Sequence, residues 1–473
     1  MRLIACALTV FYCFNIAYAE IKTLNLCQSE ELAIANNERI VEVNNLVEKA
    51  KYGYYRSISD YLPQLNFYSY AYKSENDQIL YGLGRDCFLT EFSVIQSILS
   101  TDKFYDIKIS DLIVQDLKMI RKEVVNNVIY QVRAIYNKIL LDKNNIKTAL
   151  IHIETLKDLA MRLEDKLAIG TTTTFDVNQL QVAVSNASAN YYKNMKLLKV
   201  DQDSYAKLLG YLPGTIKLET SEENIDLETI PLLNEKLSEQ RNIFLDNPIS
   251  NGLFFPKSNP QNQLDFFNTL FDKQEINKWN DIALKFRPDI LKAKKKLEIA
   301  KKQINKARGK YLPDIAFNFN YGGNPSPPSF YPSDKFNNQH MEWAAGVVLG
   351  WNIFDSFKKE FNISAQKAGA SAEKSNLNDQ IQEAFKEVRD QIFSLESSIA
   401  TNVSSEGNVM LAKQALIQSE QKLEIGTITI FDYQIALNNY IEALNINFQS
   451  LFDVVDSYYL LRHATGIDVE GKG

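Results

Sequence analysis

The chain has 473 residues, of which 45% are hydrophobic and 23% are charged, with 52 basic and 58 acidic side chains. This composition excludes a disordered chain, a collagen and a polytopic helical membrane protein. Only 18 glycines and 12 prolines interrupt the chain. Long secondary-structure elements, and hence an elongated protein, are therefore expected.

Residues 1–19 have the pattern of a secretory signal peptide. Arg2 precedes an apolar run, and Ala17-Tyr18-Ala19 form a small-x-small cleavage site before Glu20. The alternative is an ordinary buried strand, which the position and the absence of acidic residues disfavour. Loss of Arg2 changes the net charge from −6 to −7, so binding to nucleic acid has no electrostatic basis.

Two cysteines, Cys27 and Cys87, remain after this cleavage. In an exported protein they could form one disulfide. However, Cys27 lies at the start of a predicted helix and Cys87 lies beside a predicted outer loop, a helix length away. We therefore do not expect this disulfide.

The chain contains an internal repeat. Residues 31–67 align without gaps on residues 281–317 at an offset of 250, and residues 166–176 align on residues 422–432 at an offset of 256, with eight of eleven positions identical. The repeat predicts five regions: a signal peptide (1–19), a first repeat (20–211), a linker or equatorial segment (212–279), a second repeat (280–468) and a tail (469–473).

Each repeat is expected to begin with a helix, at residues 31–59 and 281–310, which ends before a proline. Two strands follow. In the first repeat they are expected at residues 65–72 and 87–99, and in the second at 315–321 and 346–353. A long helix, a tight turn and a return helix complete the repeat.

The strands of the second repeat alternate between apolar residues and small or polar ones. This alternation is typical of strands with one face toward lipid and the other toward a lumen, although a strand of a soluble sandwich is a possible alternative. No mature segment has the roughly 18 consecutive apolar residues of a membrane helix, so insertion would require strands. The residues expected to face lipid are Ile315, Phe317, Phe319, Val347, Leu349 and Trp351.

Residues 85–169 contain no Gly and no Pro. After allowance for the strand, about 60 residues can be helical, a length on the order of 90 Å. Each return stretch has 39 residues without a helix breaker. Helices of this length need a partner to bury their apolar stripes, which predicts coiled-coil hairpins.

The matched segments around Gly170 and Gly426 predict tight turns between helices. A glycine can end a helix in the left-handed conformation, and Thr173-x-x-Asp176 and Thr429-x-x-Asp432 fit helix N-caps with an acidic partner. Capping alone can account for both aspartates. Alternatively, tips gathered around an axis would form a ring of carboxylates at a constriction, or a docking surface.

We find no motif for catalysis, for a cofactor or for a metal. The three histidines, His152, His340 and His463, lie far apart in the sequence and have no Cys or carboxylate at ligand spacing. Phosphate-binding loops and nucleophile elbows are also missing from the sequence. We therefore predict neither an enzyme nor a bound cofactor.

The number of strands predicts an oligomer. Four strands per chain cannot close a transmembrane barrel, for which the minimum is about eight. Two chains would supply eight strands and three would supply twelve. Because only the larger barrels leave an open lumen, three or more chains are favoured for a channel.

The duplicated order of helix, strand pair, long helix, Gly-x-x-Thr-x-Phe-Asp turn and return helix resembles the outer-membrane efflux protein (TolC-like) family over residues 28–468. The resemblance implies a mainly α fold with a membrane β-barrel portion. Three chains would form a trimeric α-barrel of coiled-coil hairpins and a twelve-stranded β-barrel. The implied location is the outer membrane, with the helices extending into the periplasm.

The resemblance also implies roles for tip residues. Asp432 matches the acidic position of the periplasmic gate, but the position of a second acid holds Ile435, and two positions of polar ties hold Leu423 and Ile428. The usual Gly-Gly before the long helix is Asp355-Ser356. Adaptor docking is expected at the tips, which comprise Gly170, Thr171, Thr173, Phe175, Asp176, Gly426, Thr427, Thr429 and Phe431.

The implied function is a passive export conduit for small molecules, as in drug efflux, or for proteins, as in type I secretion. Its implied partners are two further copies of the chain, a periplasmic adaptor protein, an inner-membrane pump or ABC exporter, and outer-membrane lipid. The alternative is a periplasmic or surface coiled-coil protein with a structural or interaction role.

Overall fold

The structure is a computed structural model that describes residues 21–73, 86–214, 217–221, 230, 232–233, 235–238, 271–323 and 341–469. The expected signal peptide lies outside these residues. The chain divides into two compact units, one comprising residues 1–42, 122–287 and 382–473, and the other comprising residues 43–121 and 288–381. We call them the helical unit and the sheet unit.

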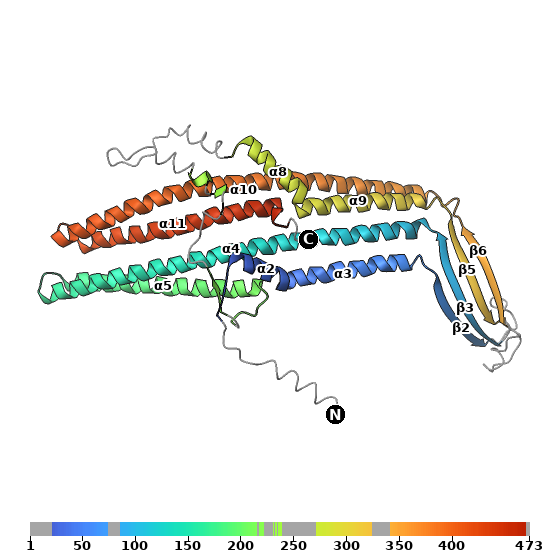
Figure 1. Ribbon diagram of the computed structural model, residues 1–473, viewed down its shortest axis with the longest axis horizontal. Helices are drawn as coiled ribbons and strands as arrows, with labels where there is room; N and C mark the ends of the chain where they lie inside the picture. The colour runs from blue at the N-terminus through green and yellow to red at the C-terminus, as the bar shows by residue number, and fades with distance from the viewer. Residues whose placement is uncertain are drawn as a thin grey trace, which may run out of the picture. The chain divides into compact units, whose positions relative to one another are not determined.

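The sheet unit contains an open antiparallel sheet in the order β2-β3-β5-β6 (Figure 1). Its strands are β2 (Gln64–Lys73), β3 (Asp86–Leu99), β5 (Asp314–Gly323) and β6 (Met341–Gly350). The strands of the second repeat were predicted from alternation of period two, and those of the first repeat as their counterparts. The last strand ends three residues earlier than expected, so Trp351 lies just beyond it, where its Nε1 donates to the backbone oxygen of Tyr311 at 3.1 Å.

The expected first helix of each repeat is wrong as a single element, because each is broken in two. In the first repeat, α2 (Leu26–Asn36) and α3 (Glu38–Ser59) are separated by Asn37. The Asn37 side chain accepts from the Arg39 amide at 3.0 Å and donates to the Leu208 backbone oxygen at 2.9 Å. The bond from the Arg39 amide is local and competes with helix hydrogen bonds at the break.

In the second repeat, α8 (Lys273–Phe286) and α9 (Pro288–Gly309) are separated by Arg287. Pro288 disfavours the helical conformation of the residue before it, and Arg287 is extended, with ψ of 120°. The helix α8 begins inside the segment expected to be a linker. Both α3 and α9 end shortly before the Tyr-Leu-Pro steps, as predicted.

Two helices of 68 residues follow the hairpins, α4 (Thr101–Ala168) and α10 (Lys358–Ile425). They are longer than the expected 60 residues because each begins within a few residues of the preceding strand. The return helices are α5 (Thr174–Leu208) and α11 (Ile430–Thr465). A short parallel pair, β1 (Ile21–Leu24) with β4 (Lys217–Thr220), and the 3-10 helix η4 (Ile467–Val469) complete the described elements.

The helical unit buries three apolar clusters. One combines α8, α10 and α11 around Leu395, and a second combines α2, α4 and α5 around Tyr136. The third lies next to the two turns, where Leu156 of α4, Leu180 of α5 and Leu437 of α11 pack together. This third cluster is called the tip cluster below. Each long helix therefore buries its apolar stripe against neighbours, as the coiled-coil prediction requires.

Candidate functional site

The turn between α4 and α5 reverses the chain with two linked motifs. Gly170 has φ of +77°, a left-handed conformation that glycine adopts without a side-chain clash. Its amide donates to the Leu167 oxygen at 2.9 Å, and the Thr171 amide donates to the Lys166 oxygen at 2.9 Å. This is the hydrogen-bond pattern of a Schellman motif, which satisfies carbonyls at the end of α4.

The return helix α5 then begins with a capping box. The Asp176 amide donates to Thr173 Oγ1 at 3.3 Å, and the Thr173 amide donates to Asp176 Oδ2 at 3.2 Å. The Thr173 hydroxyl also donates to the same Oδ2 at 2.6 Å. The predicted capping role of this aspartate is therefore observed.

The turn between α10 and α11 repeats this geometry. Gly426 has φ of +80°, and Thr427 donates to the Lys422 oxygen at 2.9 Å. The Thr429 amide donates to Asp432 Oδ2 at 2.9 Å, and the Asp432 amide donates to Thr429 Oγ1 at 3.2 Å. In both turns the hydrogen bonds from the threonine hold the pKa of the aspartate below its usual value.

The expected gate residues separate into two environments. Leu423 and Ile428 are partly buried and pack against the tip cluster. Ile435 is 43% exposed, and Asp432 is also exposed. Leu423 and Ile428 therefore contribute apolar packing and not the polar ties of the family pattern. Asp432 and Ile435 remain available to other molecules.

The two turns present apolar side chains to the outside. Phe175 is 66% exposed and Phe431 is 56% exposed, while Ile169 and Ile425, which immediately precede the two glycines, are about three-quarters exposed. The neighbouring docking candidates Gly170, Thr171, Thr173, Gly426, Thr427 and Thr429 are exposed as well. Each turn is thus a rigid loop with an exposed apolar pair.

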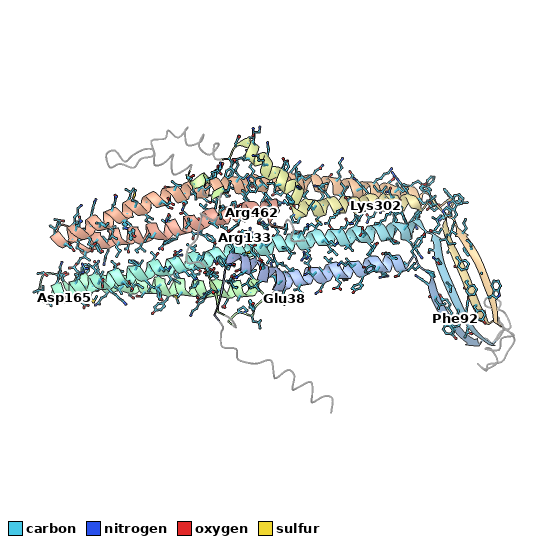
Figure 2. All side chains as sticks on the ribbon, viewed as in Figure 1. Glu38, Phe92, Arg133, Asp165, Lys302 and Arg462 are labelled. Atoms are coloured by element: carbon cyan, nitrogen blue, oxygen red, sulfur yellow. The ribbon has the colours of Figure 1, made fainter. Side chains whose placement is uncertain are left out.

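The sheet separates apolar from polar side chains by face. Register places Ile315 opposite Leu349, Phe317 opposite Val347 and Phe319 opposite Ala345, so the residues expected to face lipid share one face. The same face continues across the neighbouring pair, where Phe67 lies opposite Phe92 with ring centroids 5.0 Å apart. Val347 and Leu349 are 63% and 59% exposed. Phe92 is labelled on β3 in Figure 2.

The opposite face of the sheet is more polar, although Ile95 and Val348 also lie on it. Ser93 lies opposite Asn320 in the register, and its hydroxyl donates to Asn320 Oδ1 at 2.7 Å. Asn318 lies opposite Gly346 on the same face. A sheet with one aromatic and aliphatic face and one polar face can separate an apolar environment from water.

The junction before α10 bends without glycine, as expected from Asp355-Ser356. Ser356 and Phe357 both adopt the left-handed conformation, with φ of 58° and 65°, which is costly for residues with a side chain. The buried Lys359 ammonium donates to the backbone oxygen of Asn352. This bond ties the end of the bend to the start of the helix.

Sequence reasoning missed this lysine and its counterpart. Lys103, which is 256 positions earlier, donates to the Asp60 backbone oxygen at 2.7 Å and to Ser97 Oγ at 2.6 Å. The pair lies at the offset that relates the two turns, so comparison of the repeats at that offset would have identified both lysines. They hold the two strand-to-helix junctions of the sheet unit.

A polar cavity of about 390 Å³ lies in the helical unit between α4, α5, α10 and α11. Asparagine side chains line much of it, together with two carboxylates, and its lining includes Asn145, Asn190, Asn194, Asn445, Glu442 and Asp453. The helices are therefore polar at this level and apolar at the tip cluster.

Within the described residues, no group of three or more His, Cys, Asp or Glu side chains is arranged to hold a metal ion. Among the helices that the structure describes, none combines the length and apolarity needed to span a membrane. Cys27 is exposed and free.

Comparison with known proteins gives a family for the second repeat and related structures for most of the chain. Residues 279–466 match the model of the Outer membrane efflux protein family. No curated protein matches the chain.

Solved structures share its fold at low sequence identity. CusC, described in connection with transmembrane channel formation, is 16% identical, with 92% of each chain covered and a TM-score of 0.71. A membrane protein from Pseudomonas aeruginosa is 14% identical, with 95% of this chain and 92% of that one covered and a TM-score of 0.72. The outer membrane protein VceC of Vibrio cholerae is 15% identical, with 93% and 96% covered and a TM-score of 0.71.

These matches confirm the mainly helical fold class. The match of residues 279–466 to the Outer membrane efflux protein family agrees with the expected resemblance and with the expected localisation in the outer membrane.

Proposed function

We propose that the chain is one subunit of a trimeric outer-membrane channel-tunnel that serves as a passive export conduit. Three chains would pool their four strands into a twelve-stranded barrel, and their helical hairpins would continue it as a tunnel into the periplasm. The cargo would be small molecules, as in drug efflux, or proteins, as in type I secretion.

One observation carries this proposal, namely the two-faced sheet. Its aromatic and aliphatic face is exposed, with Val347 at 63% and Leu349 at 59%, and such exposure is unfavourable in water but suits lipid. The opposite face, with Asn318 and Asn320, suits an aqueous lumen. Four strands are too few to enclose a lumen, so copies of the chain must combine.

The turns support a docking role for the other end of each hairpin. A Schellman motif and a capping box fix each reversal, so the exposed Phe175 and Phe431 are presented at little further entropic cost. A periplasmic adaptor with apolar grooves would complement them, and the adaptor would in turn engage an inner-membrane pump or ABC exporter.

The exposed Asp432 supports a gate at the periplasmic end. Three symmetry-related copies would form a ring of carboxylates, and such a ring attracts cations. Ile435 leaves this ring without a second acid beside it. Leu423 and Ile428 pack against the tip cluster, so the closed state would rely on apolar packing in place of polar ties.

Conductance in planar bilayers tests the proposal. The purified protein should form ion-conducting channels, and Asp432→Ala should weaken block by divalent cations. Asp176→Ala is the matched control, because it removes the same type of capping carboxylate from the other turn. It should leave cation block closer to that of the unmodified channel.

A protein that stays soluble without detergent and forms no channel would contradict the proposal. That result would favour the alternative, a periplasmic or surface coiled-coil protein whose strands form a small soluble domain. In that case the apolar sheet face should be covered by protein. Detergent should then make no difference to the labelling of a Leu349→Cys variant.

A further inference from the structure

Two aspartates lie buried against each other between the helices of the first hairpin. Asp142 of α4 is 5% exposed and Asp201 of α5 is 6% exposed. Their carboxyl groups lie within hydrogen-bonding reach of each other, and Oδ2 of Asp142 has no hydrogen-bond partner among the described residues. Two ionised carboxylates cannot hydrogen-bond to each other, because neither has a hydrogen to donate.

The charged surroundings compensate for only one of the two acids. The Lys138 ammonium of α4 lies 3.1 Å from Asp201 Oδ2. The next lysine, Lys143, donates to Thr220 Oγ1 of β4 at 2.6 Å. Full ionisation would therefore leave one excess negative charge in a buried site, which is unfavourable.

The second repeat shows what the fold requires at this position. At the offset of 256, Asp142 corresponds to Ser398 and Asp201 corresponds to Ser457, and these serine hydroxyls are hydrogen-bonded at 2.9 Å. Lys138 corresponds to Ser394. A neutral hydroxyl pair thus satisfies the same helix contact in α10 and α11, so packing alone does not require the two acids and the lysine of the first repeat.

We propose that Asp142 and Asp201 form a shared proton-binding site, and that loss of its proton weakens the packing of α4 against α5. The second repeat has a serine pair in place of this site, so any pH dependence of α10 and α11 has another source, such as the buried Glu396, whose pKa burial raises to about 7. The proposal does not depend on the export function.

The pH range follows from the direction of the pKa shift. Burial, with a further contribution from Asp201, raises the pKa of Asp142 from 3.8 to about 7. A group with a raised pKa in the folded protein stabilises it fully at a pH below the unfolded pKa, and this contribution is lost as the pH rises through the folded pKa. The first hairpin should therefore lose stability between about pH 4 and pH 7.

Hydrogen exchange of the full-length protein in detergent, with a chelator present, tests the proposal between pH 5 and pH 8. After correction for the intrinsic exchange rate, the opening equilibrium around residues 138–145 and 198–205 should rise by up to about tenfold per pH unit below pH 7. The control is the same measurement on the double variant Asp142→Ser with Asp201→Ser, because the corresponding residues 394–401 include Glu396, which is also buried and has a raised pKa.

Two variants make the test decisive. The double variant Asp142→Ser with Asp201→Ser copies the second repeat and should abolish the pH dependence in α4 and α5. Asp142→Asn imitates the protonated acid and should keep at pH 8 the protection that the unmodified protein has at pH 5. Persistence of the pH dependence of α4 and α5 in the folded double variant, or its absence from the unmodified protein, would overturn the proposal.

Discussion

The helical unit and the sheet unit differ in the exposure of their apolar side chains. In the helical unit, residues such as Leu180, Leu395 and Leu461 are completely buried within the chain itself. In the sheet unit, Trp343, Val347 and Leu349 are between 59% and 70% exposed, although they belong to a regular strand, β6, that pairs with β5 along its whole length. A strand can therefore have regular backbone hydrogen bonds while its apolar side chains remain exposed.

The difference shows which apolar side chains are covered by other residues of the same chain. The helical unit has its own apolar clusters and a buried charge network, in which Arg133 and Arg462 both contact Asp468. Figure 2 labels the two arginines. The sheet takes backbone pairing from the chain but must obtain cover for its apolar face from elsewhere. Lipid is the cover that the proposed outer-membrane location would supply.

The largest effect is expected from removal of a buried charge in the helical unit. The Arg133 guanidinium lies 2.6 Å from Glu30 and 2.7 Å from Asp468. Arg133→Ala would leave both carboxylates buried with reduced compensation, and should lower the free energy of unfolding by about 3–5 kcal/mol. Denaturant unfolding in detergent measures this loss.

Lys386→Ala is the control for this variant, because Lys386 pairs with Glu383 in the same unit but both side chains are more than 60% exposed. Its cost should be about 0–1 kcal/mol. Similar losses for Arg133→Ala and Lys386→Ala would mean that the buried network does not stabilise the helical unit.

A leucine in each unit tests the comparison directly. Leu395 is fully buried in the helical unit, so Leu395→Ala should cost about 2–5 kcal/mol. Leu349 is 59% exposed in the sheet, so Leu349→Ala should cost under about 1 kcal/mol in detergent. Chemical denaturation of the two variants under identical conditions measures both values. Equal losses would show that the sheet face is covered by protein.

A smaller effect is expected at the turns. Thr429→Ala removes the side chain that accepts from the Asp432 amide and should cost about 1 kcal/mol. Thr173→Ala should have a similar effect, because its capping box has the same bonds. Hydrogen exchange near each turn should increase only in the hairpin that carries the substitution. An increase in both hairpins would contradict independent capping of the two turns.

Local patterns in the sequence predict much of the fold. Alternation of period two locates the strands of the second repeat, and the repeat places their counterparts in the first. Glycine followed by Thr-x-x-Asp identifies both turns, because this signal involves neighbouring residues. The break at Arg287 also has a local signal, Pro288, although the expected helix ran through it. Asn37 has no comparable signal, because its side chain contacts Leu208, which is distant in the sequence.

The pairing of Asp142 with Asp201 could not be predicted for the same reason. The two residues lie on different helices and are 59 positions apart, like Ser398 and Ser457, and no short motif joins them. Burial of both acids becomes apparent only when α4 and α5 pack together. The gate and docking roles of Asp432, Phe175 and Phe431 remain predictions, since their geometry explains capping and exposure without identifying a partner.

The central claim is that one face of the sheet contacts lipid and the other contacts water, and two adjacent valines test it most directly. Val347 lies on the apolar face and Val348 on the polar face, with exposures of 63% and 52% in the isolated chain. Val347→Cys and Val348→Cys can be compared in a background where Cys27 and Cys87 are replaced by serine.

The measurement is the rate of labelling by a water-soluble maleimide after reconstitution into lipid vesicles. Val348→Cys should react readily, while Val347→Cys should be protected and should become reactive when the vesicles are replaced by denaturant. Equal reactivity of the two cysteines in vesicles, or protection of Val348→Cys alone, would contradict the account.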